Sequence, residues 1–247
     1  MTESTLRAVR RDVRAEASAD DAVHLQRFFK TGPGEYGEGD HFLGLRVPAL
    51  RRLARTHRSL PVPDVLTLLA SKWHEERLLA LLLLIGHYKA GDVARKRLVY
   101  DAYLANTRHI NNWDLVDASA EHIVGPHIAP DDMGVLERLA GSGDVWERRI
   151  AMLATFHWIK QREFAPALRI AERLVNDRHD LIQKAVGWML REIGKRDGKV
   201  ERAFLREHYR TMPRTMLRYA IEKFPEAERL RYMATLAGSA SVGAERL

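Results

Sequence analysis

The chain has 247 residues, of which 46% are hydrophobic and 30% are charged, and it contains no cysteine. This composition is typical of a folded globular protein and excludes intrinsic disorder as the main state. The lack of cysteine excludes disulfides, thiolate nucleophiles and cysteine-ligated zinc or iron-sulfur sites. The formal net charge of +7 favours a polyanionic partner such as nucleic acid. Solvated helix faces rich in arginine are the alternative explanation of that charge.

No segment of the sequence has the pattern of a membrane span or of a secretory signal. The longest uninterrupted hydrophobic run, residues 78–85, ends at Gly86, far short of the roughly 20 residues needed to cross a bilayer. Residues 1–15 mix acidic side chains with arginines and lack the apolar centre of a signal peptide. We therefore expect a cytoplasmic protein.

Apolar residues return every three to four positions along most of the chain, which predicts an all-α fold. The expected helices span residues 22–30, 48–56, 63–69, 74–87, 92–106, 111–123, 133–140, 144–160, 163–176, 181–195, 199–207 and 213–224. Residues 31–40 (TGPGEYGEGD) contain four glycines and a proline, so we expect a mobile loop there. Residues 237–247 are small and polar, and we expect a flexible tail.

A repeated pattern links three of the expected helices. Arg77, Arg148 and Lys184 each stand at a fixed distance before a small residue and an apolar run, in RLLALLL, RRIAMLA and KAVGWML. Their separations of 71 and 36 residues indicate a period of about 36 with two helices in each repeat, which is typical of stacked helical hairpins. Chance similarity among leucine- and alanine-rich helices is the alternative. Residues one period apart then line a single concave surface, where we expect Trp113, Arg149 and Trp188 to converge.

The eleven histidines raise the question of a metal site. The sequence contains no HExxH motif, and Gly125 and Pro126 break the helical spacing between His122 and His127. There is also no GxSxG motif of a serine hydrolase. We expect neither a metal nor a cofactor.

The segment NNWDLVDAS (residues 111–119) is the richest in candidate chemistry. Trp113 and Asp117 are four residues apart and therefore share a helix face. A carboxylate between apolar neighbours beside an indole is costly to bury and needs a partner or a function. An ion pair between Asp117 and Arg149 of the next repeat is the structural alternative, and both roles can hold together.

Two further segments combine basic and aromatic residues. In DVWERRIA (residues 144–151), Arg148 and Arg149 point about 100° apart, so that one can face a phosphate and the other a carboxylate. In LIQKAVGWMLRE (residues 181–192), Lys184 and Arg191 share a helix face with Trp188. On an isolated helix, Trp188 would be a core residue and the two cations a solvated rim.

These three segments resemble the signature segments of the AlkD-type DNA alkylation repair enzymes, which are DNA glycosylases built from HEAT-like helical repeats. FFK (residues 28–30) and HFLGLRVPALRRLAR (residues 41–55) are similar to the N-terminal block of that family, so the resemblance covers about residues 23–221. It implies a single domain over residues 1–236, an all-α curved solenoid of about six HEAT-like helical-hairpin repeats.

The resemblance also implies roles for individual residues. Asp117 matches an aspartate that assists cleavage of the N-glycosidic bond, Trp113 and Trp188 match tryptophans that flank the lesion's deoxyribose and backbone, and Arg149 matches an arginine that acts near the phosphate. The DNA-binding candidates are basic residues of the similar segments and their flanks: Lys30, Arg148, Lys184, Arg191 and Lys195.

The sequence departs from the family's pattern at two places. The family's string often begins with two tryptophans, and this chain has Asn112 at the first of them, which affects the width and polarity of the cleft. The glycine-rich loop at residues 32–39 is also longer, which affects the reach of the protein or its range of substrates.

The expected function is that of a monofunctional DNA glycosylase of base excision repair. Such an enzyme hydrolyses the N-glycosidic bond of cationic alkylated purines, 3-methyladenine and 7-methylguanine, in duplex DNA without a tight base-flipping pocket. A fixed carboxylate such as Asp117 can stabilise the oxocarbenium character that develops at C1′. We expect a nucleoid-associated monomer. The alternatives are a non-catalytic helical-repeat scaffold, which would accept Asn or Ala at Asp117 with only a change in stability, and a protein that binds DNA or RNA structures.

Overall fold

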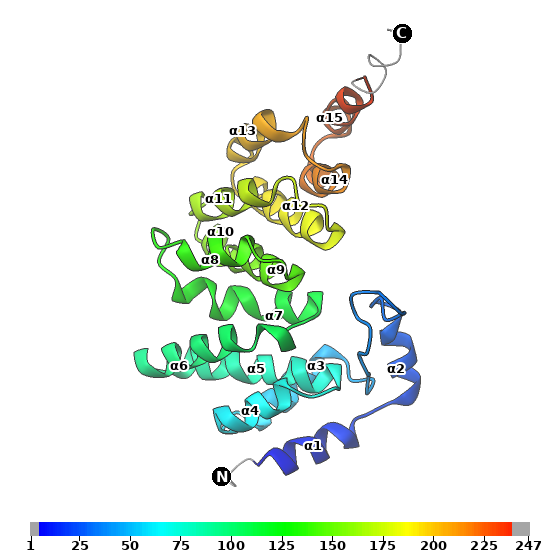
Figure 1. Ribbon diagram of the computed structural model, residues 1–247, viewed down its shortest axis with the longest axis vertical. Coiled ribbons are helices and arrows are strands. Elements are labelled where there is room, and N and C mark those ends of the chain that lie inside the picture. Colours follow the sequence, from blue (N-terminus) through cyan, green and yellow to red (C-terminus); the bar gives the residue numbers. More distant parts are fainter. Residues whose placement is uncertain (1–4, 239–247) are drawn as a thin grey trace. The chain divides into compact units, whose positions relative to one another are not determined.

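The computed structural model describes residues 5–238, and this part of the chain is helical (Figure 1). Its β-type pairing is limited to one isolated bridge between His41 and Trp73. The all-α prediction is therefore confirmed. Within the described range, no helix has the length and the apolar character needed to cross a membrane. The chain divides into two compact units, Met1–His127 and Ile128–Leu247, while the single domain expected over residues 1–236 stays a prediction.

Unit 1 is organised around one long buried helix, α5. The helices of this unit are α1 (Leu6–Ala15), α2 (Ala19–Gln26), α3 (Val47–Thr56), α4 (Val62–Leu69), α5 (His74–Ala90), α6 (Val93–Ala105) and α7 (Trp113–Ile123), with short 3-10 turns η1 (Thr107–His109) and η2 (Gly125–His127). Helix α5 packs against α3, α4, α6 and α7. Leucines on several sides of α5 are fully buried, as expected for the central helix of a core.

The first turn of α5 ties distant parts of unit 1 together through four buried polar or charged side chains, His74, Glu75, Glu76 and Arg77. The Glu75 carboxylate accepts hydrogen bonds from the backbone N–H groups of residues 43–45, including Gly44 at 2.8 Å. Gly44 has φ +85°, and a Cβ there would lie 2.0 Å from the Ser18 carbonyl oxygen, so no other residue fits. Glu76 accepts a 3.0 Å hydrogen bond from Arg14 of α1.

Unit 2 is organised around α12 in the same way. Its helices are α8 (Gly134–Ala140), α9 (Val145–Ala154), α10 (Phe156–Lys160), α11 (Ala165–Leu174), α12 (Asp180–Gly194), α13 (Gly198–His208), α14 (Arg214–Ala220) and α15 (Glu226–Gly238), with the 3-10 turn η3 (Ile221–Lys223). Helix α12 contacts α9, α10, α11, α13 and α14. A Cβ at Gly187 would lie 2.4 Å from the Met216 carbonyl oxygen, so this glycine permits the close approach of α12 to α14.

The repeat predicted from the sequence has a structural counterpart in the turns that precede α5 and α9. Arg77 Nη1 donates to the Ser71 carbonyl at 3.1 Å, and Arg148 Nη1 donates to the Ser142 carbonyl at 2.9 Å. Both arginines thus bind the carbonyl six residues earlier. Before α12, Gln183 rather than Lys184 makes the equivalent bond, to the Asp177 carbonyl at 3.0 Å. At two of the three repeat positions, the repeated arginine therefore holds the turn that leads into its helix.

Two helices were not expected, and one expected helix is divided. Helix α1 forms in a highly charged segment because Val9 and Val13, four residues apart, are fully buried. Helix α15 follows the last expected helix. The helix expected over residues 144–160 is interrupted at Thr155, whose backbone N–H and Oγ1 both donate to the Met152 carbonyl. This 3-10-type turn separates α9 from α10.

Residues 31–40 form a succession of hydrogen-bonded turns. Glutamate side chains of the loop accept from its own backbone, Glu35 from Gly32 N–H at 2.9 Å and Glu38 from Gly34 N–H at 2.8 Å. The expected mobility of this loop stays a prediction. Of the expected flexible tail, residues 237 and 238 belong to α15 and residues 239–247 lie outside the described part of the chain.

Candidate functional site

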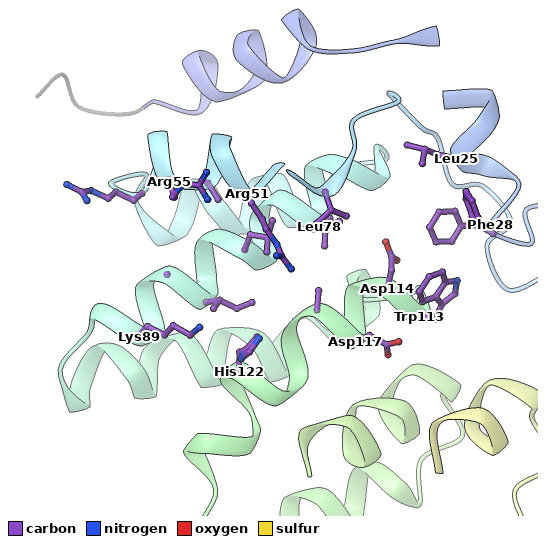
Figure 2. A pocket seen from close by; sticks show the side chains of 18 residues that line it. Leu25, Phe28, Arg51, Arg55, Leu78, Lys89, Trp113, Asp114, Asp117 and His122 are labelled. Atoms are coloured by element: carbon purple, nitrogen blue, oxygen red, sulfur yellow. The ribbon is translucent and has the colours of Figure 1, made fainter. Parts of the chain in front are cut away.

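A cavity of about 910 Å³ opens in unit 1, and the candidate catalytic residues Trp113 and Asp117 line it. Helices α3, α5 and α7 line it, together with residues just before the glycine-rich loop. Figure 2 shows Phe28, Trp113, Asp114 and Asp117 towards one end of the cavity, and Arg55 and Lys89 towards the other. The lining is thus aromatic and acidic at one end and basic at the other.

Helix α7 places Trp113 and Asp117 on the wall of this cavity, as their spacing predicts. The opposite face of α7 carries Leu115, Val116 and Ser119, which are buried. Burial of that face fixes the rotation of the helix, so the half-exposed indole and carboxylate point into the cavity. This part of the candidate site is set by one helix.

Asn112, where the family's pattern often has a tryptophan, is completely buried. Its amide Nδ2 donates a 2.9 Å hydrogen bond to Asp40 Oδ2, and its Oδ1 accepts from the backbone N–H of Trp113 at 2.8 Å. Asp40 is the last residue of the glycine-rich loop. The two departures from the family's pattern are therefore joined in this structure, because Asn112 holds the end of the loop against the start of α7.

The buried imidazole of His74 also connects Asp40 to the first turn of α7. His74 Nε2 lies 2.8 Å from Asp114 Oδ2, and His74 Nδ1 lies 3.2 Å from Asp40 Oδ2. Burial opposes the charged imidazole, but the carboxylates of Asp114 and Asp40 outweigh it and raise the pKa of His74 to about 9. His74 is therefore an imidazolium at neutral pH.

Asp40 is the common partner in this network. Burial raises its pKa, but hydrogen bonding to His74, the charge of Arg77 and the Asn112 amide together lower the pKa below its ordinary value. Arg77 Nη2 lies 2.6 Å from Asp40 Oδ1. The cations of His74 and Arg77 and the carboxylates of Asp40 and Asp114 thus hold the first turn of α7 in place. Asp117 lies one turn further along the helix.

Aromatic rings pack against His74, the imidazole of this network. Phe29 stacks on Trp113 with 5.4 Å between ring centroids, and on Phe42 with 5.1 Å. The His74 ring lies 4.8 Å from Phe29 and 5.0 Å from Phe42. Trp113 therefore presents a supported face rather than a freely rotating ring. Phe28, 62% exposed, adds a second aromatic side chain to the lining.

In unit 2, the side chains of Arg148 and Arg149 donate hydrogen bonds to other groups of the protein. Arg148 Nε donates to Asp177 Oδ2 at 2.8 Å, and its Nη1 donates to the carbonyls of Ser142 and Gly143. Arg149 is 5% exposed and donates from Nη1 to the Leu181 carbonyl at 2.6 Å. Both arginines thus hold the segments around them, and their roles in DNA binding and catalysis stay predictions.

Trp188 of α12 and Lys195, just after this helix, both contact the carboxylate of Glu192. Trp188 is half-buried and its Nε1 donates to Glu192 at 3.3 Å. Lys195 Nζ lies 2.6 Å from the same carboxylate. Burial raises the pKa of Glu192, but hydrogen bonds from Lys195 and Arg196 lower it below its ordinary value.

The remaining cations predicted from the sequence differ in their partners. Lys184 pairs with Asp180 one turn earlier at 2.6 Å, and Arg191 pairs with Glu222. In unit 1, the Lys30 side chain is exposed, and its backbone carbonyl accepts a 2.7 Å hydrogen bond from Gly37. DNA contacts by these residues stay predictions.

The model of the family described as DNA alkylation repair enzyme matches residues 9–224 of this chain. The chain belongs to that family. A solved structure described as a predicted DNA alkylation repair enzyme from Enterococcus faecalis is similar to it with a TM-score of 0.65, at 14% identity over 85% of this chain and 97% of that one.

Two further solved structures share the fold of this member of the DNA alkylation repair family. They are described as AlkD2 from Streptococcus mutans and as smu.31 from Streptococcus mutans UA159. Each has a TM-score of 0.55 at 16% identity and covers 90% of this chain and 100% of its own. No curated protein matches the sequence.

Sequence reasoning missed several residues of the cavity in this family member. Arg51, Arg55 and Arg58 line it from α3 and the turn that follows, and Lys89 lines it from α5. Their signal is present in VPALRRLARTHR, where three arginines recur at helical spacing. His74 and Asp40 carry no local signal, because they are far apart in the sequence. Among residues 5–238, no group of histidine, aspartate and glutamate side chains is arranged to hold a metal ion.

Proposed function

We propose that the protein is a monofunctional DNA glycosylase that hydrolyses the N-glycosidic bond of cationic alkylated purines, such as 3-methyladenine and 7-methylguanine, in duplex DNA. One observation carries the proposal. Asp117 and Trp113 line one large cavity, one turn apart on α7, and the basic side chains of Arg51, Arg55, Arg58 and Lys89 line the same cavity. Membership of the DNA alkylation repair family supports the same chemistry.

The substrate determines what the protein must supply. Alkylation at N3 of adenine or N7 of guanine gives the base a positive charge, so the base leaves as a neutral molecule with the electrons of the glycosidic bond. No general acid is needed to protonate it. The oxygen of a water molecule forms the new bond to C1′, and the water's proton is released to solvent. The products are the free base and an abasic site.

Catalysis then depends on the positive charge that develops at the sugar. A carboxylate held near C1′ stabilises this charge and orients the attacking water, as in glycoside hydrolysis. Asp117 is the proposed carboxylate. Burial raises the pKa of the Tyr103 hydroxyl, and the charge of the nearby Asp117 adds to this rise, so the carboxylate lies close to a buried part of unit 1. Electrostatic stabilisation is strongest in such a region.

Trp113 contributes in two ways in this proposal. Its indole face attracts a cation by about 0.5 to 2 kcal/mol, depending on how far the site is desolvated. Stacking on Phe29 holds this face in place before the substrate binds. The ring also excludes water from one side of the reacting sugar, so that the water oriented by Asp117 is the nucleophile.

The cavity favours selection of lesions by the lability of the bond rather than by a close fit to one base. Its volume of about 910 Å³ lies near the upper end of the range for small-molecule sites, which is about 300 to 1,000 Å³. Lys89 lies towards the end of the cavity away from Trp113 and Asp117 (Figure 2). This placement supports hydrolysis of labile, cationic lesions by water rather than attack by a lysine amine.

The deciding experiment measures free 3-methyladenine and 7-methylguanine released from a methylated duplex. We expect release above the spontaneous rate by the native protein and a loss of 100-fold or more, to order of magnitude, in Asp117→Asn, with DNA affinity retained. Asp101→Asn on α6, an exposed aspartate paired with Arg97, is the matched control and should be fully active. Trp188→Ala and Arg149→Gln in the same assay test the roles predicted for these residues.

Each outcome of this experiment has a definite meaning. No release above the spontaneous rate removes the glycosylase proposal and favours the scaffold or structure-binding alternatives. Normal release by Asp117→Asn removes Asp117 as the catalytic carboxylate and directs attention to Asp114, which lines the same cavity.

A further inference from the structure

Four cations line the cavity of unit 1, and the resemblance to the family assigns no role to them. We call Arg51, Arg55, Arg58 and Lys89 the basic stripe. All four side chains are exposed, and none makes a hydrogen bond or ion pair with any residue between 5 and 238. Helix α3, VPALRRLART, contains no acidic residue that could neutralise them.

Several other arginines in the described part of the chain are paired with carboxylates. Arg77, Arg148 and Arg191 are each paired with a carboxylate, and the neighbouring Arg52 is paired with Glu16. Like charges one helical turn apart destabilise a helix by about 0.2 to 0.5 kcal/mol for each pair. Arg51 and Arg55 are such a pair. An arrangement that costs stability, and that faces a cavity, indicates an anionic ligand.

The spacing of the stripe fits a chain of phosphates rather than one small anion. Arg51 and Arg55 are about 6 Å apart along the helix axis, since each residue rises about 1.5 Å. Successive phosphates of one DNA strand rise about 3.4 Å each. Because arginine side chains are long and flexible, a row over residues 51–58 spans about three phosphates.

The place of the stripe within the cavity gives the ligand its orientation. The carboxylates of Asp114 and Asp117 and the ring of Trp113 lie towards one end, and Arg55 and Lys89 lie towards the other (Figure 2). A polyanion would be repelled from the acidic end and attracted to the basic end. A nucleotide whose sugar lies at Trp113 and Asp117 would therefore leave its flanking phosphates on the basic stripe.

We infer that the basic stripe binds consecutive phosphates of the DNA strand that carries the damaged nucleotide. The inference rests on the proposed function for the identity of the ligand. It assigns the main electrostatic contact of unit 1 to α3 and to the end of α5, and it leaves Asp117 to act on the sugar.

The test compares two triple variants with the same loss of charge. In the first, Arg51, Arg55 and Arg58 are each changed to glutamine. In the control, Arg52, Arg97 and Arg169 are changed to glutamine, because all three are exposed and paired with carboxylates. The stripe variant loses no side-chain interaction among residues 5–238 and is relieved of like-charge repulsion within α3, so its melting temperature should equal or slightly exceed that of the native protein. Affinity is measured by fluorescence anisotropy for an undamaged duplex and for a duplex with a stable abasic-site analogue.

Salt dependence is the decisive readout. Each phosphate contact contributes about 0.9 to the slope of log affinity against log salt, so the stripe variant should lose about 2 to 3 from that slope. Between about 50 and about 200 mM salt, the salt-driven loss of affinity should therefore be about 40-fold smaller in the stripe variant than in the native protein. Lys89→Gln added to the stripe variant should lower the slope by about a further 0.9. The control should keep the native slope.

The outcomes separate this inference from the proposed glycosylase activity. An unchanged slope in the folded stripe variant, or an equal change in the control, overturns the inference even if bases are released. A lowered slope with no base release from methylated duplex supports the stripe and removes the glycosylase proposal. If both hold, kcat/KM of the stripe variant should fall by the same factor as its affinity, while kcat stays within about 2-fold, because the stripe binds phosphate and does not touch the reacting bond.

Discussion

His74 Nε2 lies 2.8 Å from Asp114 Oδ2, and this contact joins the buried start of α5 to the first turn of the helix that carries the candidate catalytic carboxylate. On its other side, the same ring reaches Asp40 at the end of the glycine-rich loop. The charged ring therefore helps to hold the start of α7 against the core of unit 1. Asp117 lies one turn further along the same helix.

His74→Gln should destabilise the protein in a pH-dependent way. The pKa of His74 is raised from 6.5 to about 9 in the folded state. A raised histidine pKa stabilises the fold fully below about pH 6.5, and this contribution is lost as the pH rises through about 9. We expect the variant to be about 2 to 3 kcal/mol less stable at pH 6 and much closer to the native protein at pH 10.

Chemical unfolding of both proteins from pH 6 to pH 10 measures this difference. The exposed His24→Gln is the control and should follow the native protein at every pH. A stability difference for His74→Gln that does not change with pH would show that the ring acts through packing and not through its charge.

Asn112→Ala should lower the free energy of unfolding by about 1 to 2 kcal/mol, because the charged Asp40 loses a buried hydrogen bond. The variant should also lose activity beyond its loss of stability, since Asn112 joins the glycine-rich loop to the start of α7. Urea unfolding and the base-release assay at a temperature where the variant is folded check the two effects. Asn176→Ala, at an exposed position, serves as the control. Native stability in Asn112→Ala would contradict the role of this bond.

Arg148→Gln should destabilise unit 2 by about 2 to 3 kcal/mol, because a half-buried guanidinium loses its bonds to Asp177 and to two backbone carbonyls. Arg169→Gln, which removes an exposed ion pair with Glu137, should cost less than about 1 kcal/mol. Differential scanning calorimetry and duplex affinity are measured together. A loss of affinity without a loss of stability would favour the phosphate-binding role predicted from the sequence over the structural one.

Glu201→Gln should make the protein more stable at alkaline pH. Glu201 is 2% exposed and packs against α12 at Gly194, and burial raises its pKa from 4.5 to about 8. The protonated Glu201 carboxyl therefore stabilises the fold fully below about pH 4.5, and this contribution is lost as the pH rises through about 8. The stability of the variant relative to the native protein should increase across that window, by at most about 1.4 kcal/mol per pH unit.

Thermal denaturation from pH 4.5 to pH 9 tests this expectation, with Glu207→Gln as the control, because that side chain is 77% exposed. A constant difference between Glu201→Gln and the native protein would mean that the carboxyl is ionised throughout the range and is paired.

Features that depend on neighbours in the chain could be predicted from the sequence. The period of apolar residues predicts most of the helices, and the spacing of four residues places Trp113 and Asp117 on one face of α7. The repeat of the arginine near the start of α5 and of α9 was also visible, although its physical role in holding the preceding turn was not. The pattern failed at α1, where arginines hide the two buried valines.

The tertiary structure alone decided which charged groups are engaged and which are available. Asp40, His74 and Asp114 are far apart in the chain, and no local period connects them before the core of unit 1 brings them together. Arg51 and Arg148 look alike in the sequence, yet Arg51 lines a cavity and has no side-chain partner among residues 5–238, whereas Arg148 binds a carboxylate and two carbonyls. The physical reason is that helix formation follows from local backbone geometry, whereas the pairing of a charge depends on whatever side chains and backbone groups folding places within a few ångströms of it.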